Sequence, residues 1–212
     1  GWGWLFAVGL RMVSVLVAQL LTVRALLVLV SPAFGERQVR LAVLGYVVAV
    51  TTMVVFMELA TVRFLAEFDH RPDRMFWEYL NHPEEVAETV LKTAWGSLIV
   101  AAVVLPAFAW SAWRWGALTW NRLDTRHWGV RLALFPLVGG LLFLCIRGTL
   151  SHRPVNISTA AFSNENLLNQ LALNSTYTAA YALYAFRHEA DSAAVYGKME
   201  TARMLALVRR AS

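Results

Sequence analysis

Five ionisable side chains between residues 58 and 74 are the strongest candidates for binding chemistry. They are Glu58, Arg63, Asp69, Arg71 and Arg74. A charge at the centre of a membrane-spanning helix costs about 2.5–3.5 kcal/mol or more, so such residues usually pair with one another or mark a functional site. Arg71 and Arg74, three residues apart across Pro72, would supply cationic donors for a phosphate, because guanidinium groups bind phosphate through paired hydrogen bonds. We therefore predict that these residues line or order a polar recess that faces the outer leaflet and suits a lipid head group.

Structural pairing is the alternative explanation for the same kind of charge. Arg63 and Glu67 are four residues apart, which places them on one face of a helix. Arg11 and Glu58 both fall in the outward half of their apolar segments, where they could pair between adjacent helices. Under this interpretation the charges stabilise a helix bundle and contact no ligand.

Residue patterns for catalysis are missing from the sequence. It has no metal-ligand cluster, no glycine-rich phosphate loop and no HExxH or GxSxG motif. The five histidines are scattered along the chain, and the single cysteine, Cys145, excludes an intrachain disulfide. We therefore predict that this sequence contains no catalytic and no metal-binding residues.

The composition indicates a membrane protein. Of the 212 residues, 58% are hydrophobic and 16% are charged, and the mean hydropathy is +0.51. The charges lie in blocks between long apolar runs, which is typical of a chain that crosses the bilayer several times. Basic residues of such proteins gather at the cytoplasmic face, so the net charge of +5 does not indicate nucleic-acid binding.

Four apolar segments have about the length needed to cross the bilayer as helices. They cover approximately residues 4–30, 41–66, 95–113 and 130–146. A further helix start is predicted at Pro83, where a polar cap precedes the proline and Glu84 and Glu85 follow in the first turn. We predict an all-α fold, with a transmembrane helix bundle over residues 1–147 and an outer loop over residues 67–92.

The loops predict the orientation of this bundle. Residues 31–40 and 111–131 are basic, and tryptophans flank the second of these loops, so both are expected at the cytoplasmic face. Residues 67–92 carry seven acids against three bases and are expected outside. Four spans would then leave both Gly1 and the tail after Arg147 outside. We expect a fifth span before Gly1 in the full-length protein, because a chain without a cleaved signal more simply starts in the cytoplasm.

The tail, residues 148–212, has a Ser- and Asn-rich start followed by amphipathic helical patterns. Ser163 is predicted to cap a helix that reaches Leu173, and Ser175 to cap another that reaches about His188. Residues 193–211 form a third amphipathic pattern with basic residues at its end. We predict an extracytoplasmic helical linker that leads toward a further domain.

Two long motifs resemble a known family. Residues 56–86, FMELATVRFLAEFDHRPDRMFWEYLNHPEEV, are similar to the outer loop of the lipoteichoic acid synthase-like phosphoglycerol transferases, with Asp73 and Met75 where Asn and Leu are more usual. Residues 147–183, RGTLSHRPVNISTAAFSNENLLNQLALNSTYTAAYAL, resemble the stretch that links the last span of that family to its catalytic domain. Gly9-Leu10-Arg11 matches a GLR of the family, although the Phe-Asp-Leu that usually follows is replaced by Met-Val-Ser.

The resemblance implies a function whose catalytic part lies outside this sequence. The family has a five-span membrane domain and an extracytoplasmic catalytic domain of the alkaline phosphatase/sulfatase superfamily. That domain binds a divalent metal, typically Mn²⁺, and uses a threonine nucleophile. It transfers glycerol phosphate from phosphatidylglycerol to a glycolipid-linked or glucan acceptor. The resemblance therefore implies a bacterial inner-membrane protein whose partners are membrane lipids and its own C-terminal catalytic domain.

Two other function classes remain open. A related sulfatase or phosphoethanolamine transferase would use the same membrane anchor for different chemistry. A non-enzymatic assembly subunit would hold a partner through a stripe of apolar and aromatic side chains at helical spacing in the tail, although such a stripe more often packs internally. Its residues are Leu173, Tyr177, Tyr181 and Tyr184. A metal-binding acid and a threonine in the sequence after Ser212 would favour the enzyme.

Overall fold

The computed structural model describes residues 2–30, 36–120, 128–150 and 152–195. These residues form α1 (Trp2–Val30), α2 (Glu36–Phe68), α3 (Arg74–Tyr79), α4 (Pro83–Thr93), α5 (Trp95–Trp120), α6 (Trp128–Arg147), a short 3₁₀ helix η2 (Ile157–Ala160), α7 (Asn166–Ala172) and α8 (Ser175–Val195). No strand occurs in the described ranges, which confirms the predicted all-α fold.

Four of the helices, α1, α2, α5 and α6, are long and apolar enough to cross a membrane, which confirms the predicted spans. The helices extend beyond the predicted bounds: α2 begins at Glu36 and α5 continues to Trp120. Charged and tryptophan side chains are accommodated at the membrane interface, so a helix need not stop where the hydrocarbon ends. Most of the loop predicted over residues 111–131 is therefore helical, and residues 121–127 lie outside the described ranges.

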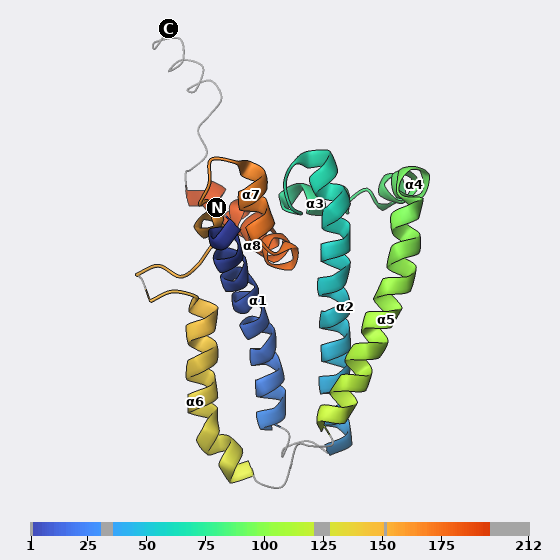
Figure 1. Cartoon of the computed structure of the whole chain (residues 1–212). Helices are drawn as coiled ribbons and strands as arrows, with labels where there is room; N and C mark the ends of the chain where they lie inside the picture. The colour runs from blue at the N-terminus through green and yellow to red at the C-terminus, as the bar shows by residue number, and fades with distance from the viewer. Residues whose placement is uncertain (1, 31–35, 121–127, 151, 196–212) are drawn as a thin grey trace.

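The spans form two helix pairs. The helix α1 packs mainly against α6, and α2 packs mainly against α5 (Figure 1). At Gly116 of α5, an added Cβ would lie only 2.7 Å from a methyl carbon of Leu44 on α2, so these two helices approach closely. The helices α1 and α2 contact each other less extensively, and the Tyr46 hydroxyl joins them by donating to the Leu20 carbonyl at 2.9 Å.

Large apolar side chains cover the outward faces of the spans. Val103 of α5 is 66% exposed and Leu137 of α6 is 63% exposed. In water, leaving such a side chain exposed forgoes about 1.5–3 kcal/mol relative to burial. In lipid the same faces are an ordinary outer surface, because the helices satisfy their backbone hydrogen bonds internally. The chain is thus built as a membrane protein.

The remaining helices gather at one end of the bundle. Figure 1 shows α7 and α8 near the start of α1, α3 near the end of α2, and α4 at the start of α5. The alternation of the loops predicts the same arrangement, with residues 67–92 and the tail on one side of the membrane. The helix start predicted at Pro83 is present, since α4 has His82 at its N-cap position and Glu84 and Glu85 in its first turn.

The caps of the tail helices differ from the prediction. Asn174, rather than Ser175, caps α8, because its Oδ1 accepts from the N–H groups of Thr176 (3.0 Å) and Tyr177 (3.2 Å). Asparagine and serine are almost equally good caps, so composition alone could not choose between neighbours. The helix then runs beyond His188 to Val195, and most of the third predicted helix, residues 193–211, lies outside the described ranges.

The predicted cap at Ser163 is also displaced. The helix α7 begins at Asn166, with Glu165 in the N-cap position. The Ser163 hydroxyl oxygen instead accepts from the Glu165 N–H at 3.2 Å, which forms a turn before the helix. The α7 helix is therefore shorter than predicted.

Candidate functional site

The loop that follows α2 folds back into the bundle. The chain reverses at Asp69, whose φ of 58° lies in the left-handed region that aspartate tolerates better than most residues. The Asp69 N–H donates to the Leu65 carbonyl at 3.1 Å and closes the last turn of α2. After this reversal, Arg71 and Pro72 are both buried.

Arg71 binds the C-terminal end of α7. Its Nε donates to the Gln170 carbonyl at 2.6 Å, and its Nη2 donates to the Leu171 carbonyl at 3.4 Å. Its backbone N–H donates to the Gln170 side-chain oxygen at 3.0 Å. The last carbonyls of a helix have no partner within that helix, and a cation beside them also favours the negative end of the helix dipole.

Glu58 of α2 pairs with Arg71 and also binds the start of α8. The Arg71 Nη1 lies 3.0 Å from Glu58 Oε2 and 3.2 Å from Oε1. The N–H of Ser175, the first residue of α8, donates to the same Oε1 at 3.0 Å. A carboxylate at this position satisfies a free N–H and favours the positive end of the helix dipole. The ion pair therefore serves both helix ends at the α7–α8 junction.

Hydroxyl groups complete this arrangement. The Ser175 hydroxyl oxygen accepts from Arg71 Nη1 at 2.7 Å and shares a hydrogen bond with the Thr61 hydroxyl of α2. The Thr178 hydroxyl donates to the Pro72 carbonyl at 2.9 Å. We call Glu58, Thr61, Arg71, Gln170 and Ser175 the Arg71 cluster. It joins α2, the loop after α2, α7 and α8.

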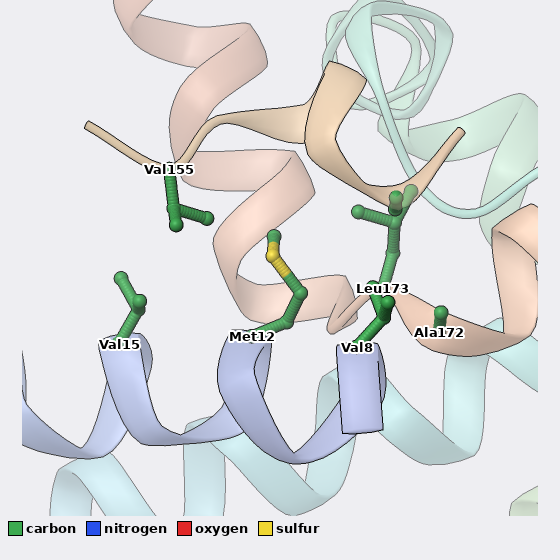
Figure 2. Close-up of a cluster of buried hydrophobic side chains, with 7 residues drawn as sticks. Val8, Met12, Val15, Val155, Ala172 and Leu173 are labelled. Carbon is green, nitrogen blue, oxygen red and sulfur yellow. The ribbon is translucent and has the colours of Figure 1, made fainter. Parts of the chain in front are cut away.

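Apolar packing holds the tail against α1. Figure 2 shows side chains of α1 facing side chains of the tail, and Met12 at the centre is fully buried. The facing residues are Val8, Met12 and Val15 on α1, and Val155, Ala172 and Leu173 in the tail. The α7–α8 junction thus lies between α1, which it contacts through apolar groups, and α2, which it contacts through the Arg71 cluster.

The stripe predicted in the tail packs only at its start. Leu173 is buried, and the Tyr177 hydroxyl donates to the Val155 carbonyl at 3.3 Å. Burial, and after it the neighbouring Tyr181, raises the pKa of the Tyr177 phenol above its usual value of 10.0. Tyr181 and Tyr184 are 45% and 63% exposed. The second half of the stripe is therefore open to a partner or to solvent.

The structural-pairing interpretation predicts a pair between Arg11 and Glu58, and this pair does not form. Its Nε donates to the Gly148 carbonyl at 2.5 Å, at the end of α6. Gly148 has a φ of 61° and closes α6 through its N–H, which donates to the Leu144 carbonyl at 2.9 Å. Arg11 therefore binds a helix C-terminus, whose carbonyls were not visible as partners in the sequence.

The other predicted residues lie apart from Arg71. Arg63 donates to the Thr93 carbonyl at 3.2 Å, at the end of α4, so the predicted pair with Glu67 does not form. The Asp69 carbonyl accepts from the Asn166 side chain at 3.0 Å. The structure thus brings Glu58 and Arg71 together and leaves Arg63 and the exposed Asp69 outside the cluster.

Arg74 lies outside the cluster, at the start of α3. Its Nε pairs with Glu78 Oε1 at 2.7 Å, and its guanidinium carbon lies 5.1 Å from the centre of the Phe186 ring of α8. Trp77 joins the same two helices, because its indole N–H donates to the Ala179 carbonyl at 2.8 Å. The predicted contact of Arg71 and Arg74 with a lipid phosphate stays a prediction.

Sequence reasoning missed the tail half of the cluster. The sequence predicts Ser175 only as a cap, and Gln170 in the tail, like Thr61 on α2, gives no signal because polar residues at such positions are common. The spacing of Ser175 and Thr178 does place both hydroxyls on one helical face, but a second segment was needed to show what that face contacts.

The cluster is suited to holding helices together. The Glu58 carboxylate contacts the backbone N–H of Ser175 rather than its hydroxyl, so it does not act as a base on that oxygen. In the described ranges, no three His, Cys, Asp or Glu side chains lie close enough together to hold a metal ion. No protein-family model and no solved structure matches the chain.

Proposed function

We propose that the chain is the membrane domain of a bacterial phosphoglycerol transferase, which moves glycerol phosphate from phosphatidylglycerol to a glycan or glycolipid acceptor of the cell envelope. One observation carries this proposal. The two stretches that resemble the lipoteichoic acid synthase-like family, residues 56–86 and 147–183, meet in the Arg71 cluster. Glu58, Thr61 and Arg71 come from the first stretch, and Gln170 and Ser175 come from the second. Two distant stretches that resemble one family and also bind each other support a single functional unit.

In this proposal the bundle anchors the enzyme and the docked tail positions it. The catalytic domain would follow the tail in the full-length protein and would contain the divalent metal and the threonine nucleophile. A tail fixed at the α7–α8 junction restricts where that domain can lie above the bilayer. Such positioning favours reaction with a donor confined to the membrane, since fixing two reactants in place removes an entropic barrier.

The end of α2 and the start of α3 would contact the donor head group. Arg63 and Arg74 are exposed at the end of the bundle where the tail docks, and they are the cations that we assign to this contact, with Asp69 ordering the loop between them. Arg71 has a different role, because its donors already serve α7, Glu58 and Ser175. The proposal places this end of the bundle at the outer face of the inner membrane, as the basic loops at the other end suggest.

Lipid turnover tests the proposal. The full-length protein is reconstituted with Mn²⁺ into vesicles that contain either phosphatidylglycerol or phosphatidylethanolamine, and released diacylglycerol is measured by mass spectrometry. We expect diacylglycerol from phosphatidylglycerol and none after chelation of the metal. Release from phosphatidylethanolamine alone would identify a phosphoethanolamine transferase instead. Release from neither lipid would favour a sulfatase or an assembly subunit that uses the exposed tyrosines of α8.

A further inference from the structure

An open groove lies between α1 and α2, beside the first turn of α8. Its volume is about 250 Å³. Its lining consists of apolar side chains and one threonine, and the lining residues are Leu20, Ala49, Val50, Met53, Val54 and Thr176. The helices α1 and α2 contact each other less extensively than α1 contacts α6 or α2 contacts α5, which leaves room for the groove between them.

Thr176 is the polar end of this groove. Its backbone N–H donates to the capping Asn174 side chain, but its hydroxyl is buried and has no hydrogen-bond partner in the described part of the chain. Buried hydroxyls nearly always have a partner, because an unpaired one loses the hydrogen bonds it made in water. The groove therefore combines an apolar body with one unused donor.

The length of α6 indicates how deep the groove lies in the bilayer. This helix has 20 residues, or about 30 Å at 1.5 Å per residue, which equals the thickness of the hydrocarbon core. Its end contacts Arg11 of α1, and the α7–α8 junction packs on the same part of α1. The junction, with Glu58, therefore lies near the outer boundary of the hydrocarbon.

The groove extends inward from that boundary. Val54 and Ala49 precede Glu58 by four and nine residues on α2, so they lie about 6 and 14 Å deeper along the helix. This is the depth of the upper part of an acyl chain, and Thr176, next to Ser175 at the boundary, lies near the depth of the ester carbonyls.

We propose that the groove holds one acyl chain of a diacyl phospholipid, with the Thr176 hydroxyl donating to an ester carbonyl of that lipid. Water does not fill an apolar space of this kind, whereas lipid chains surround it on the open side. The site goes beyond the proposed reaction, since it requires a bound lipid and no particular head group.

Photolabelling tests the site in the full-length protein. The protein is reconstituted into phosphatidylcholine vesicles with a small fraction of phosphatidylcholine that carries a diazirine in the upper third of one chain. After irradiation, labelled residues are mapped by peptide mass spectrometry. We expect Leu20 and residues 49–54 to be labelled several-fold more than Val103 and Leu137, which face lipid on the outer surface. We also expect this label to decline slowly when unlabelled lipid is added before irradiation.

Matched variants decide whether the label comes from the groove. Ala49→Trp fills the space and should lower groove labelling to the level of the outer surface, while Val103→Trp on the lipid-facing side of α5 should leave it unchanged. Thr176→Val keeps the side-chain shape and should speed exchange of the lipid. Thr52→Val is the control for Thr176→Val and should leave lipid exchange unchanged. The Thr52 hydroxyl is also buried with no partner among the described residues, but Thr52 does not line the groove.

Three results would overturn the proposal. The first is labelling of the groove no stronger than that of the outer surface. The second is groove labelling that Ala49→Trp does not lower together with lipid exchange that Thr176→Val does not speed. If Ala49→Trp fails to fold, the exchange rate of the near-isosteric Thr176→Val alone decides whether the groove binds lipid. The third is cross-linking of the groove residues to a peptide that precedes Gly1, which would show that protein rather than lipid fills the space.

Discussion

Glu58 and Arg71 each stabilise a helix end as well as each other. The Arg71 side chain is 9% exposed and the Glu58 side chain is 41% exposed, so the arginine depends more on its partners than the glutamate does. An arginine at this depth is tolerated because the carboxylate, two carbonyls and a hydroxyl surround it. Loss of either charge therefore affects two helices at once.

Replacement of Arg71 by alanine should destabilise the protein by about 3 kcal/mol, because it removes the charge paired with Glu58 and the donors to the Gln170 and Leu171 carbonyls. The apparent unfolding temperature in detergent measures this effect. The unfolding temperature of Arg71→Lys should fall between those of the wild type and Arg71→Ala, since a lysine keeps the charge but cannot reproduce the planar set of donors. Arg153→Ala is the matched control: its side chain is exposed in the tail, and we expect a change below about 0.5 kcal/mol. Equal effects of Arg71→Ala and Arg153→Ala would refute the internal role of Arg71.

Gly148 is the residue where backbone conformation matters most. Its φ is 61°, and an added Cβ would lie 2.8 Å from a Val155 methyl and 2.9 Å from a Val15 methyl. Gly148→Ala should therefore lower the free energy of unfolding by roughly 1–3 kcal/mol. Gly45→Ala, at a position of α2 with open space around it, should cause no loss. Comparison of the two unfolding temperatures checks the prediction, and an equal response would contradict it.

At the level of elements, the tail helices are bound to the bundle by two different surfaces. The Arg71 cluster holds them to α2, and apolar packing around Met12 holds them to α1. Arg71→Ala should release only the first surface. Hydrogen–deuterium exchange should then become faster in residues 166–183 and stay unchanged in α5, which does not contact the tail extensively. Unchanged exchange in the tail would show that the cluster does not dock it.

The docking of α8 should also weaken at high pH. Because burial raises the pKa of the Tyr177 phenol above 10.0, folding favours the neutral form. The stabilisation that depends on the neutral phenol is complete below pH 10 and is lost as the pH rises through the folded-state pKa. The unfolding temperature should therefore fall above pH 10, and this part of the fall should be absent in Tyr177→Phe. An identical pH profile for the variant would contradict the assignment.

The sequence predicted elements better than contacts. Long apolar runs identified the four spans, and proline with two glutamates identified the start of α4, because these signals are local. Apart from Glu58, the partners of Arg71 are about 100 residues further along the chain, at Gln170, Leu171 and Ser175. Nothing local distinguishes a serine that caps a helix from one that also contacts an arginine of another segment.

The described part of the chain forms two helix pairs, which the tail helices α7 and α8 join at one end (Figure 1). In the proposed function, the Arg71 cluster holds the tail helices, and through them the proposed catalytic domain, close to the bilayer. Loss of the cluster should therefore impair reaction with a membrane-bound donor and spare reaction with a soluble one. Neither the tail alone nor the spans alone would produce such a difference.

The most direct measurement compares two activities of the full-length protein, with wild type, Arg71→Ala and the control Arg153→Ala. One activity is diacylglycerol release from phosphatidylglycerol vesicles, and the other is hydrolysis of a soluble phosphate ester. We predict that Arg71→Ala lowers lipid turnover about tenfold, which corresponds to about 1.4 kcal/mol, and leaves hydrolysis of the soluble ester near the wild-type rate. Arg153→Ala should retain both activities. Two activities that fall together in Arg71→Ala, or that both stay at the wild-type rate, would contradict the account.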